Sequence, residues 1–322
     1  MILVAGSANL DFVVRAQHIP APGETVLGRD FETFPGGKGA NQAIACARAG
    51  GVPTHMLLAL GQDAFAPAIE ESLRGAGVAM HTVRATDQPT GTAFICVSDD
   101  GENAITVAPG ANHTLRPAHL AEHIPNLADF SHVLMQLETP VDTVTAYATA
   151  ARQAGVTVAL NAAPALVLPA KLLTEIDILI VNEGELATVA QHSGSVAACL
   201  AHIKTPCVVV TLGHRGCIAR VRDDFLVQTA YSVTPVDTTA AGDTFCGAFI
   251  AALSQGATFQ NAMQTACAAG ALACTVLGAQ ASIPGARAIQ NFIASQATHT
   301  SMTSEVVMQK AAELRSYCGL VG

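Results

Sequence analysis

The 322-residue sequence contains no tryptophan and only three tyrosines, and it has few charged residues, with more acidic than basic side chains. Sixteen Lys and Arg residues against twenty-five Asp and Glu residues give a formal net charge of −9. A protein that binds nucleic acid generally presents a basic surface, so this balance argues against that class. A small anionic substrate is still allowed, because a local pocket can oppose the charge of the whole chain.

Long apolar runs and paired cysteines are also absent. No run approaches the roughly 18 residues that a membrane-spanning helix needs, so we expect no membrane partner. Met1-Ile-Leu-Val-Ala carries no basic leader and Asp11 follows soon after, which favours a first strand over a signal peptide. The nine cysteines are scattered without a C-x-x-C pair, as is typical of reduced, buried thiols. These features together predict a cytoplasmic protein.

Short β-rich runs alternate with longer helical patterns along the chain, which predicts an α/β fold with a parallel sheet covered by helices. The apolar runs predicted as buried strands are Ile2–Ala5, Met56–Leu60, Val133–Gln136, Val156–Leu160, Ile178–Val181 and Val208–Leu212. The predicted helices are Ala40–Ala49, Ala64–Gly75, Val141–Ala154, Glu185–Gln191, Thr244–Leu253 and Phe259–Thr275.

Three segments instead alternate apolar and polar residues, as strands exposed on one face do. They are Glu24–Phe34 and the pair Thr92–Val97 and Ala104–Val107, which predicts a hairpin with its turn at Asp99-Asp100-Gly101. We expect these strands to form a small lid sheet, built from about 12–35 and 88–110, over a site.

The C-terminal segment differs from the rest of the chain. We expect one domain over residues 1–295 with the lid inserted in it, and an extension of unknown role at 296–322. Thr303-Ser304 could cap a short helix that carries Val306, Val307, Ala311 and Leu314.

The strongest local signal is the run of small residues that leads into Gly242-Asp243, where a helical pattern begins. The backbone N–H groups of Ala241, Gly242 and Asp243 at a helix N-terminus would suit an anion such as a transferring phosphoryl group. Asp243 could accept a proton from an attacking hydroxyl, or it could simply cap the helix. This motif alone leaves both interpretations open.

A second glycine-rich turn, Gly36-Gly37-Lys38-Gly39, enters the helix that carries Asn41. It has neither the spacing of the G-x-x-x-x-G-K-[ST] phosphate-binding loop nor that of G-x-G-x-x-G. Glycines here would let the backbone approach a polyhydroxyl ligand, while Lys38 and Asn41 supply donors. The alternative is a tight turn with a solvated lysine.

Further polar residues follow the predicted strands, where ligands bind in open α/β sheets. Asn9 and Asp11 suit vicinal sugar hydroxyls, and Asn182 and Glu185 could organise hydrated magnesium. Glu138 and the turn at 211–216, which could border a nucleotide, complete the group. Each alone is more simply a turn or cap, but together they predict one site.

His119, Glu122 and His123 match H-x-x-E-H, a zinc-peptidase pattern. Pro117 and Pro125 confine that helix to about two turns, and no third ligand is evident. We therefore favour a solvated polar helix over a zinc site. A non-catalytic sugar-binding regulator is a second alternative function, beside the zinc peptidase.

From Met1 to about Phe292 the sequence resembles the PfkB carbohydrate-kinase family, and its ribokinase branch in particular. Both family signatures are present, in Gly36–Ala43 and Asp237–Phe245. Asn9-Leu10-Asp11 and Gln136-Leu137-Glu138-Thr139-Pro140 support the same branch. The resemblance implies a ribokinase-like three-layer α/β/α fold with a mostly parallel central sheet and a small β-sheet lid.

The resemblance also implies a reaction, the transfer of the γ-phosphate of MgATP to the 5-hydroxyl of D-ribose. Another family member acting on deoxyribose, a nucleoside or a different sugar is the alternative. A monovalent cation, usually potassium, activates the family, and pairing of lids implies a homodimer.

The family's functional residues map onto positions of this sequence. The sugar-binding positions are Asn9, Asp11, Gly37, Lys38, Asn41, Glu138 and Asp243, with Asp243 as the base and Ala240, Ala241 and Gly242 as the anion hole. Asn182 and Glu185 match the N-x-x-E motif associated with magnesium and phosphate. The nucleotide positions are Thr211, Leu212, Gly213, His214, Arg215 and Gly216, together with Cys267, where the family often has a histidine near the adenine. The monovalent-cation positions are Asp237, Thr239, Ala273, Val276, Gly278 and Ser282.

Overall fold

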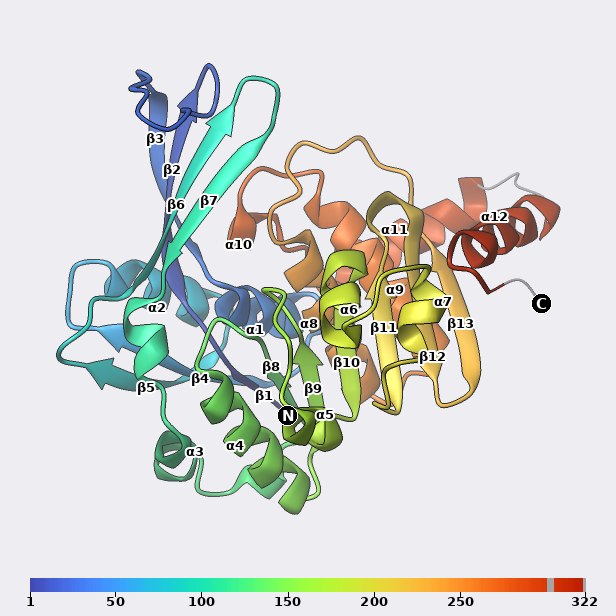
Figure 1. The fold of residues 1–322 in the computed structure, drawn as a ribbon, viewed down its shortest axis with the longest axis horizontal. Coiled ribbons are helices and arrows are strands. Elements are labelled where there is room, and N and C mark those ends of the chain that lie inside the picture. The colour runs from blue at the N-terminus through green and yellow to red at the C-terminus, as the bar shows by residue number, and fades with distance from the viewer. Residues whose placement is uncertain (300–303, 321–322) are drawn as a thin grey trace.

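A computed structural model describes residues 1–299 and 304–320 of the chain. Its centre is a nine-stranded sheet, in which only β12 runs against its neighbours (Figure 1). In spatial order the strands are β13 (Asp224–Thr229), β12 (Gly216–Val221), β11 (Cys207–Thr211), β10 (Ile178–Asn182), β9 (Thr157–Asn161), β8 (His132–Met135), β1 (Ile2–Ala5), β4 (Thr54–Gly61) and β5 (Ala79–Ala85).

The sheet separates two apolar cores, because alternate side chains of a strand point to opposite faces. Ile2 and Val4 of β1 pack into the first core, and Leu3 and Ala5 pack into the second. The helices that contribute to the first core are α1 (Lys38–Arg48), α2 (Ala66–Gly75), α8 (Ala241–Ser254), α9 (Phe259–Ala273) and α11 (Ala286–His299). Those of the second are α3 (Pro117–His123), α4 (Val141–Gln153), α5 (Ala170–Glu175), α6 (Glu183–Ala190), α7 (Val196–Leu200) and α12 (Ser304–Tyr317). The predicted three-layer α/β/α fold is confirmed.

The chain changes direction across the sheet at β1. From β1 it continues to β4 on one side, and it later returns to β8 on the other and proceeds outward through β9, β10 and β11. Loops that leave neighbouring strands in opposite directions create a crevice at their carboxyl ends. The polar residues that follow β1, β8 and β10 therefore come out at one edge of the sheet.

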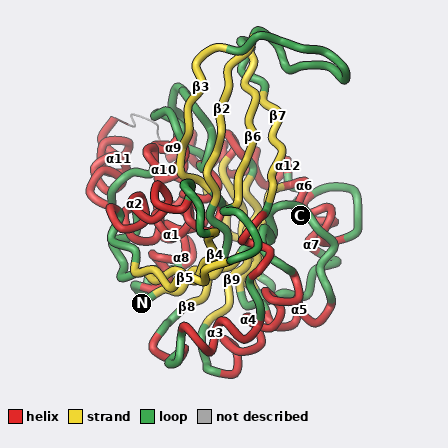
Figure 2. Tube along the Cα trace, turned by 90° about the vertical axis from the view of Figure 1, so that its left-hand side faces the viewer, coloured by secondary structure: helices red, strands yellow, loops and turns green. Residues whose placement is uncertain are grey.

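A separate four-stranded sheet, called the small sheet below, stands away from the body (Figure 2). Its strands are β3 (Arg29–Gly36), β2 (Asn9–Ala16), β6 (Gly91–Ser98) and β7 (Asn103–Ala108), in spatial order. β2 and β6 pair in parallel, whereas the outer pairs are antiparallel. The predicted hairpin is confirmed, with Gly101 in its turn at a φ of 87°.

Some elements differ from their predictions. β5, β12 and β13 were not predicted; β5 and β13 are the two edges of the sheet, where polar residues such as His81 and Gln228 replace a continuous apolar run. Strand β3 begins only at Arg29, so the first part of the alternating segment that starts at Glu24 is not a strand. The small sheet also begins earlier than residue 12, because β2 starts at Asn9 directly after the loop that follows β1.

The C-terminal segment forms helix α12 (Ser304–Tyr317), as predicted, and Leu314 of this helix is buried. Its predicted cap residue Thr303 lies outside the described residues. In the part of the chain that the structure describes, no helix has both the length and the apolar character needed to cross a membrane.

Candidate active site

The carboxylate of Asp243 lies where α8 meets α1. Asn41 donates from Nδ2 to Oδ2 of Asp243 over 2.9 Å, and Gln42 donates from Nε2 to Oδ1 over 2.9 Å. Asp243 is buried. The N-cap of α8 is Ala240, in the left-handed region at a φ of 59°, and no side chain caps the helix. Asp243 therefore does not serve as the cap; its carboxylate faces α1.

Uncapped backbone N–H groups begin α8. Ala241 donates its N–H to the carbonyl of Thr238 over 3.2 Å, so this N–H, one of the three expected from the sequence to bind an anion, is already engaged. Within the described residues, no hydrogen bond is found for the N–H of Gly242 or of Asp243. A Cβ placed on Gly242 would meet no atom within 4 Å, so the space before this turn is open. The turn combines free donors, the positive end of a helix dipole and room for an anion.

A cluster of charged side chains lies beside Asp243. Oε2 of Glu138 accepts hydrogen bonds from Oγ of Ser7 at 2.6 Å and from the backbone N–H of Lys38 at 3.1 Å. Burial, followed by the negative charges of Glu138 and Asp243, raises the pKa of Asp11 to about 7. The negative charge of Asp243 raises the pKa of the Lys38 ammonium, against the effect of burial. The carboxylates of Asp11, Glu138 and Asp243 are therefore among those that interact with the single ammonium of Lys38.

The two glycines before α1 allow the chain to pass close to this cluster. A Cβ on Gly36 would lie 2.1 Å from Oδ2 of Asp11. Gly37 has a φ of 88°, and a Cβ there would lie 2.7 Å from the backbone nitrogen of Asn9. The glycines therefore admit Asn9 and Asp11 of β2 next to the start of α1, a packing role in addition to the ligand approach expected from the sequence.

The side-chain amides of Asn9 and Asn41 differ in whether their oxygens accept a hydrogen bond from the protein. Asn112 donates from Nδ2 to Oδ1 of Asn9 over 2.7 Å and so fixes the orientation of that amide. Oδ1 of Asn41 is buried and has no hydrogen-bond partner among the described residues. An orphaned acceptor next to Asp243 fits a donor that a bound ligand would bring, such as a sugar hydroxyl.

A chain of hydrogen-bonded side-chain amides lies behind Asp243, and the sequence did not predict it. Gln136 donates from Nε2 to Oε1 of Gln42 over 2.6 Å, and Nε2 of Gln42 also reaches Oδ1 of Asn161 at 3.0 Å. These buried amides fix the orientation of Gln42, which in turn orients Asp243. Gln42 follows Asn41 inside the glycine-rich signature, which was the available signal.

Asn182 and Glu185 form a reciprocal cap at the start of α6. Oδ1 of Asn182 accepts from the N–H of Glu185 at 2.8 Å, and Oε2 of Glu185 accepts from the N–H of Asn182 at 2.8 Å. Burial raises the pKa of Glu185, and the charges of Lys38 and Asp243 also act on it. The two residues are therefore a cap, as the simpler interpretation held, and they also lie at the edge of the charged cluster.

A large cleft of about 940 Å³ opens beside this cluster, and Gly242 is part of its wall. Of the six positions from 211 to 216, four line the cleft, namely Thr211, Gly213, His214 and Gly216. Cys267 lines it too. Two of the predicted nucleotide positions do not: Leu212 is buried in the second core, and Arg215 turns outward to stack over the ring of Tyr317, 4.2 Å from its centroid.

The loop before α8 and the loop after α9 meet at Asp237. Oδ1 of Asp237 accepts from the N–H and the hydroxyl of Thr239, at 2.9 and 2.7 Å, and Oδ2 accepts from the N–H of Gly278 at 2.9 Å. Burial alone would raise the pKa of Asp237, but these hydrogen bonds lower it below its ordinary value. Ala273 and Val276 are joined by a 3.3 Å backbone hydrogen bond. Ser282 ends α10 (Ala279–Ser282), the short helix that follows Gly278, and its hydroxyl donates to Ala279.

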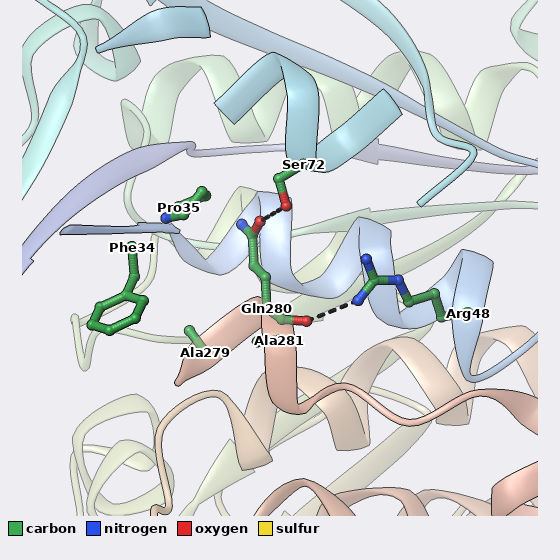
Figure 3. A pocket seen from close by; sticks show the side chains of 7 residues that line it. All are labelled: Phe34, Pro35, Arg48, Ser72, Ala279, Gln280 and Ala281. Atoms are coloured by element: carbon green, nitrogen blue, oxygen red, sulfur yellow. Dashed lines mark hydrogen bonds between the residues drawn. The ribbon is translucent and has the colours of Figure 1, made fainter. Parts of the chain in front are cut away.

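A smaller cavity of about 230 Å³ lies where the small sheet joins the body (Figure 3). Phe34 and Pro35 of β3 line it together with Gln280 of α10. Oε1 of Gln280 accepts from the hydroxyl of Ser72 at 2.5 Å, and its backbone carbonyl accepts from Arg48 at 3.0 Å. These bonds connect α1, α2 and α10 at the base of the small sheet.

The H-x-x-E-H segment falls on α3, away from these groups. The rings of His119 and His123 are 6.3 Å apart, and Nδ1 of His119 accepts from the N–H of Arg116. In residues 1–299 and 304–320 no group of three or more His, Cys, Asp or Glu side chains could hold a metal ion. Nothing in the described chain therefore supports a zinc peptidase.

Comparison with known proteins places this geometry in a family. The ribokinase of Haemophilus influenzae is 37% identical over 291 residues, which cover 88% of this chain and 95% of that protein. The bifunctional ribokinase/ribose-5-phosphate isomerase A of Fructilactobacillus sanfranciscensis is 36% identical over 98% of this chain, which spans 59% of that longer protein. The structure of Arabidopsis thaliana ribokinase complexed with ribose and ATP superposes with a TM-score of 0.83 at 32% identity, covering 91% of this chain and 98% of that one.

The model of the pfkB family of carbohydrate kinases matches residues 1–286, which include both glycine-rich turns and every residue of the charged cluster. The chain belongs to the pfkB family of carbohydrate kinases.

Proposed function

We propose that the chain transfers the γ-phosphate of ATP to the 5-hydroxyl of D-ribose, giving D-ribose 5-phosphate and ADP. One observation carries the proposal: the Asp243 carboxylate, held by Asn41 and Gln42, belongs to the polar cluster while its neighbour Gly242 lines the cleft. A base is thus located between a place for a polyhydroxyl acceptor and a place for a nucleotide. Relatives named ribokinase, at 33–37% identity, support the choice of sugar.

In this proposal the sugar binds among Asn9, Asp11, Gly37, Lys38, Asn41 and Glu138. Carboxylates accept from sugar hydroxyls, and Lys38 donates to them. The unpaired Oδ1 of Asn41 would accept one further hydroxyl proton. The negative charges of the cluster keep Lys38 protonated, so it remains a donor.

Asp243 would accept the proton of the 5-hydroxyl of ribose while the oxygen of that hydroxyl forms a bond to the γ-phosphorus of ATP. The bond between that phosphorus and the bridging oxygen breaks, and ADP leaves with the electron pair. The N–H groups of Gly242 and Asp243 would hold the transferring phosphoryl group, since phosphoryl transfer depends chiefly on positioning and charge stabilisation. The helix-start pattern predicted this role for the N–H groups of 241–243, and the family resemblance implied it for 240–242. Because the N–H of Ala241 already donates to Thr238, we assign the role to Gly242 and Asp243.

Magnesium would be held at the N-x-x-E segment. Asn182 and Glu185 are hard oxygen donors at the edge of the cluster, which suits a hydrated Mg²⁺ that also takes phosphate oxygens. The bound ion would neutralise phosphate charge as the γ-phosphoryl group is transferred. The residues present fit this ion only with ATP bound, because the described part of the chain offers no all-protein cage.

A monovalent cation, with potassium as the first choice, would bind the loops that meet at Asp237. The donors would be Asp237, Thr239, Ala273, Val276, Gly278 and Ser282, mostly through carbonyl oxygens. The low pKa of Asp237 keeps its carboxylate charged. Because Thr239 and Ala240 connect this loop directly to α8, an ion there would stabilise the left-handed turn that presents the phosphate donors.

The small sheet would act as a lid, and a second copy of the chain would pair with it. The strand register puts Val107 and Ile105 on the same face of the small sheet as Asp11, one of the residues proposed to bind the sugar. Phe12 stacks on Phe31 and Phe94, and Phe31 and Phe94 are more than half exposed. Exposed aromatic side chains clustered on one sheet are typical of an interface, so we assign this patch to a homodimer contact.

Residues 1–295 would form the kinase domain with the lid segments inserted, and 296–322 an extension. The cysteines are all free thiols, and they agree with the cytoplasmic location that the sequence predicts.

An ADP-release assay with purified protein, MgATP and a panel of sugars tests the proposal. D-ribose should give the highest kcat/KM, above 2-deoxyribose, nucleosides and other sugars, and potassium should raise the rate. A higher kcat/KM for 2-deoxyribose would reassign the substrate within the family. Ribose binding without any ADP release would instead identify a non-catalytic sugar-binding protein.

A further inference from the structure

The C-terminal helix α12 lies outside the region that defines the family, which ends at residue 286, yet it borders the nucleotide cleft. Lys310 of this helix lines the cleft together with residues of α6, α8 and α9. In Figure 1 the helix lies beside β13, at the end of the body away from the small sheet. The kinase fold alone therefore does not form the whole wall of this cleft.

Helix α12 is fixed to the rim of the cleft by several contacts. The hydroxyl of Tyr317 donates to Oε1 of Glu183 over 2.6 Å, and Glu183 is itself a lining residue. The guanidinium of Arg215 stacks over the Tyr317 ring. Arg315 donates to the carbonyl of Phe225 at 3.1 Å, and Ala197 donates its N–H to the carbonyl of Cys318 at 2.9 Å.

The spacing of the helix brings Lys310 to the same side as these anchors. Lys310, Leu314 and Tyr317 stand at positions i, i+4 and i+7, which form one stripe of an α-helix. Leu314 is 4% exposed and packs into the second core. Leu314 and Tyr317 contact the body of the protein. Because Lys310 belongs to the same stripe of the helix, its side chain is directed to the same side and lines the cleft.

The charges of the cleft give Lys310 a role. Of the described residues that line it, Lys310 is the only lysine or arginine, and Glu183 contributes a negative charge. Among the side chains that the structure describes, none forms an ion pair with Lys310. A nucleoside triphosphate brought into this cleft carries several negative charges, and an ammonium without a carboxylate partner on the wall would attract them.

We propose that Lys310 is a nucleotide-binding residue whose ammonium pairs with the polyphosphate of the nucleotide, so that the C-terminal extension completes the nucleotide site. The proposal rests on the proposed function for the identity of the ligand. It also gives the extension a purpose that the family's own signatures do not supply.

Calorimetric titration of the full-length chain with ATP, ADP and adenosine, in magnesium-containing buffer, tests this. Lys310→Gln should weaken ATP binding about 3- to 10-fold at low ionic strength. The loss should be smaller for ADP and absent for adenosine, and added salt should reduce it. The KM for ATP should rise in the same proportion as its Kd, and Lys310→Arg should restore both.

Lys171→Gln, which removes an exposed lysine on α5, is the matched control and should bind all three ligands as the wild-type chain does. Thermal unfolding of each variant checks that the fold is retained. Wild-type ATP affinity in Lys310→Gln, or an equal loss for ATP and adenosine, would overturn the assignment of Lys310 while leaving the kinase proposal intact. Failure of the wild-type chain to bind ATP would overturn both.

Discussion

Nδ2 of Asn41 donates a hydrogen bond to Oδ2 of Asp243 over 2.9 Å, across a sequence separation of 202 residues. Both residues lie in the first turn of a helix, Asn41 in α1 and Asp243 in α8. The contact therefore joins the two glycine-rich segments that sequence inspection marks separately. The cluster that we propose for the sugar and the turn that we propose for the phosphate therefore meet at one carboxylate.

Replacement of the carboxylate should remove catalysis without removing the site. Asp243→Asn keeps the size of the side chain but cannot accept the hydroxyl proton, so turnover should fall by about 10²–10⁴. Ribose affinity, measured by calorimetry, should change little, because Asn9, Asp11 and Glu138 remain. Turnover near that of the wild-type chain would show that Asp243 is not the base.

A methyl group at the start of α8 should interfere with the nucleotide but not with the fold. A Cβ on Gly242 meets no protein atom within 4 Å, and alanine favours a helix over glycine by about 1 kcal/mol. Gly242→Ala should therefore keep or slightly raise the melting temperature while kcat/KM for ATP falls at least about tenfold, because the methyl group takes the place of the phosphate. Unchanged kcat/KM would mean that no phosphate docks there. Gly285→Ala, at another glycine with open space around it, is the matched control.

The folding stability of the ligand-free protein should depend on pH through the titration of Asp11. The folded pKa of Asp11, about 7, lies above its ordinary value of 3.8, so the folded state holds an additional proton between these two values. The stability associated with that proton is complete below about pH 4 and is lost as the pH rises through 7, at most about 4 kcal/mol. Asp11→Asn, which is neutral at every pH, should gain melting temperature relative to the wild-type chain from about pH 5.5 to about pH 8. A constant difference over this range would contradict the raised pKa.

The same titration should appear in sugar binding. Ribose hydroxyls donate to the ionised form of Asp11, so ribose affinity in the absence of nucleotide should fall as the pH is lowered from about 8 to about 6. Asp11→Asn should bind ribose more weakly and lose this pH dependence. A wild-type affinity that does not vary over this range would argue against a sugar contact for Asp11.

Introduction of a charge into the aromatic patch of the small sheet should separate the two copies of the proposed dimer. Phe94 is 53% exposed and stacks on Phe12. Phe94→Glu should shift the chain from dimer to monomer in sedimentation experiments, since an interface rarely tolerates a buried unpaired charge. Phe94→Leu keeps the apolar contact and should remain dimeric. A wild-type chain that is monomeric at high concentration would contradict the interface.

Much of the fold was predictable from the sequence because buried parallel strands are continuous apolar runs. Ile2–Ala5 and Val208–Leu212 were found for this reason, within one residue of β1 and β11. The edge strands β5 and β13 were not, because an edge strand is partly exposed and its polar residues break the pattern.

The site was predictable in its residue types more than in its contacts. The position of Asp243 after a run of small residues marked the turn that we propose for the phosphate. The sequence could not show that the N–H of Ala241 donates to the carbonyl of Thr238. Nor could it reveal the amides of Gln42, Gln136 and Asn161, which orient one another only after distant segments fold together. The inward position of Leu212 and the outward stacking of Arg215 depend on the β11–β12 turn and on α12, which no local pattern encodes.

A crystal structure of the chain with ribose and a non-hydrolysable ATP analogue is the most direct test of the account. We expect the γ-phosphate at the N–H groups of Gly242 and Asp243, and the 5-hydroxyl of ribose within hydrogen-bond distance of the Asp243 carboxylate. A γ-phosphate bound elsewhere in the cleft, with the sugar out of reach of Asp243, would contradict it.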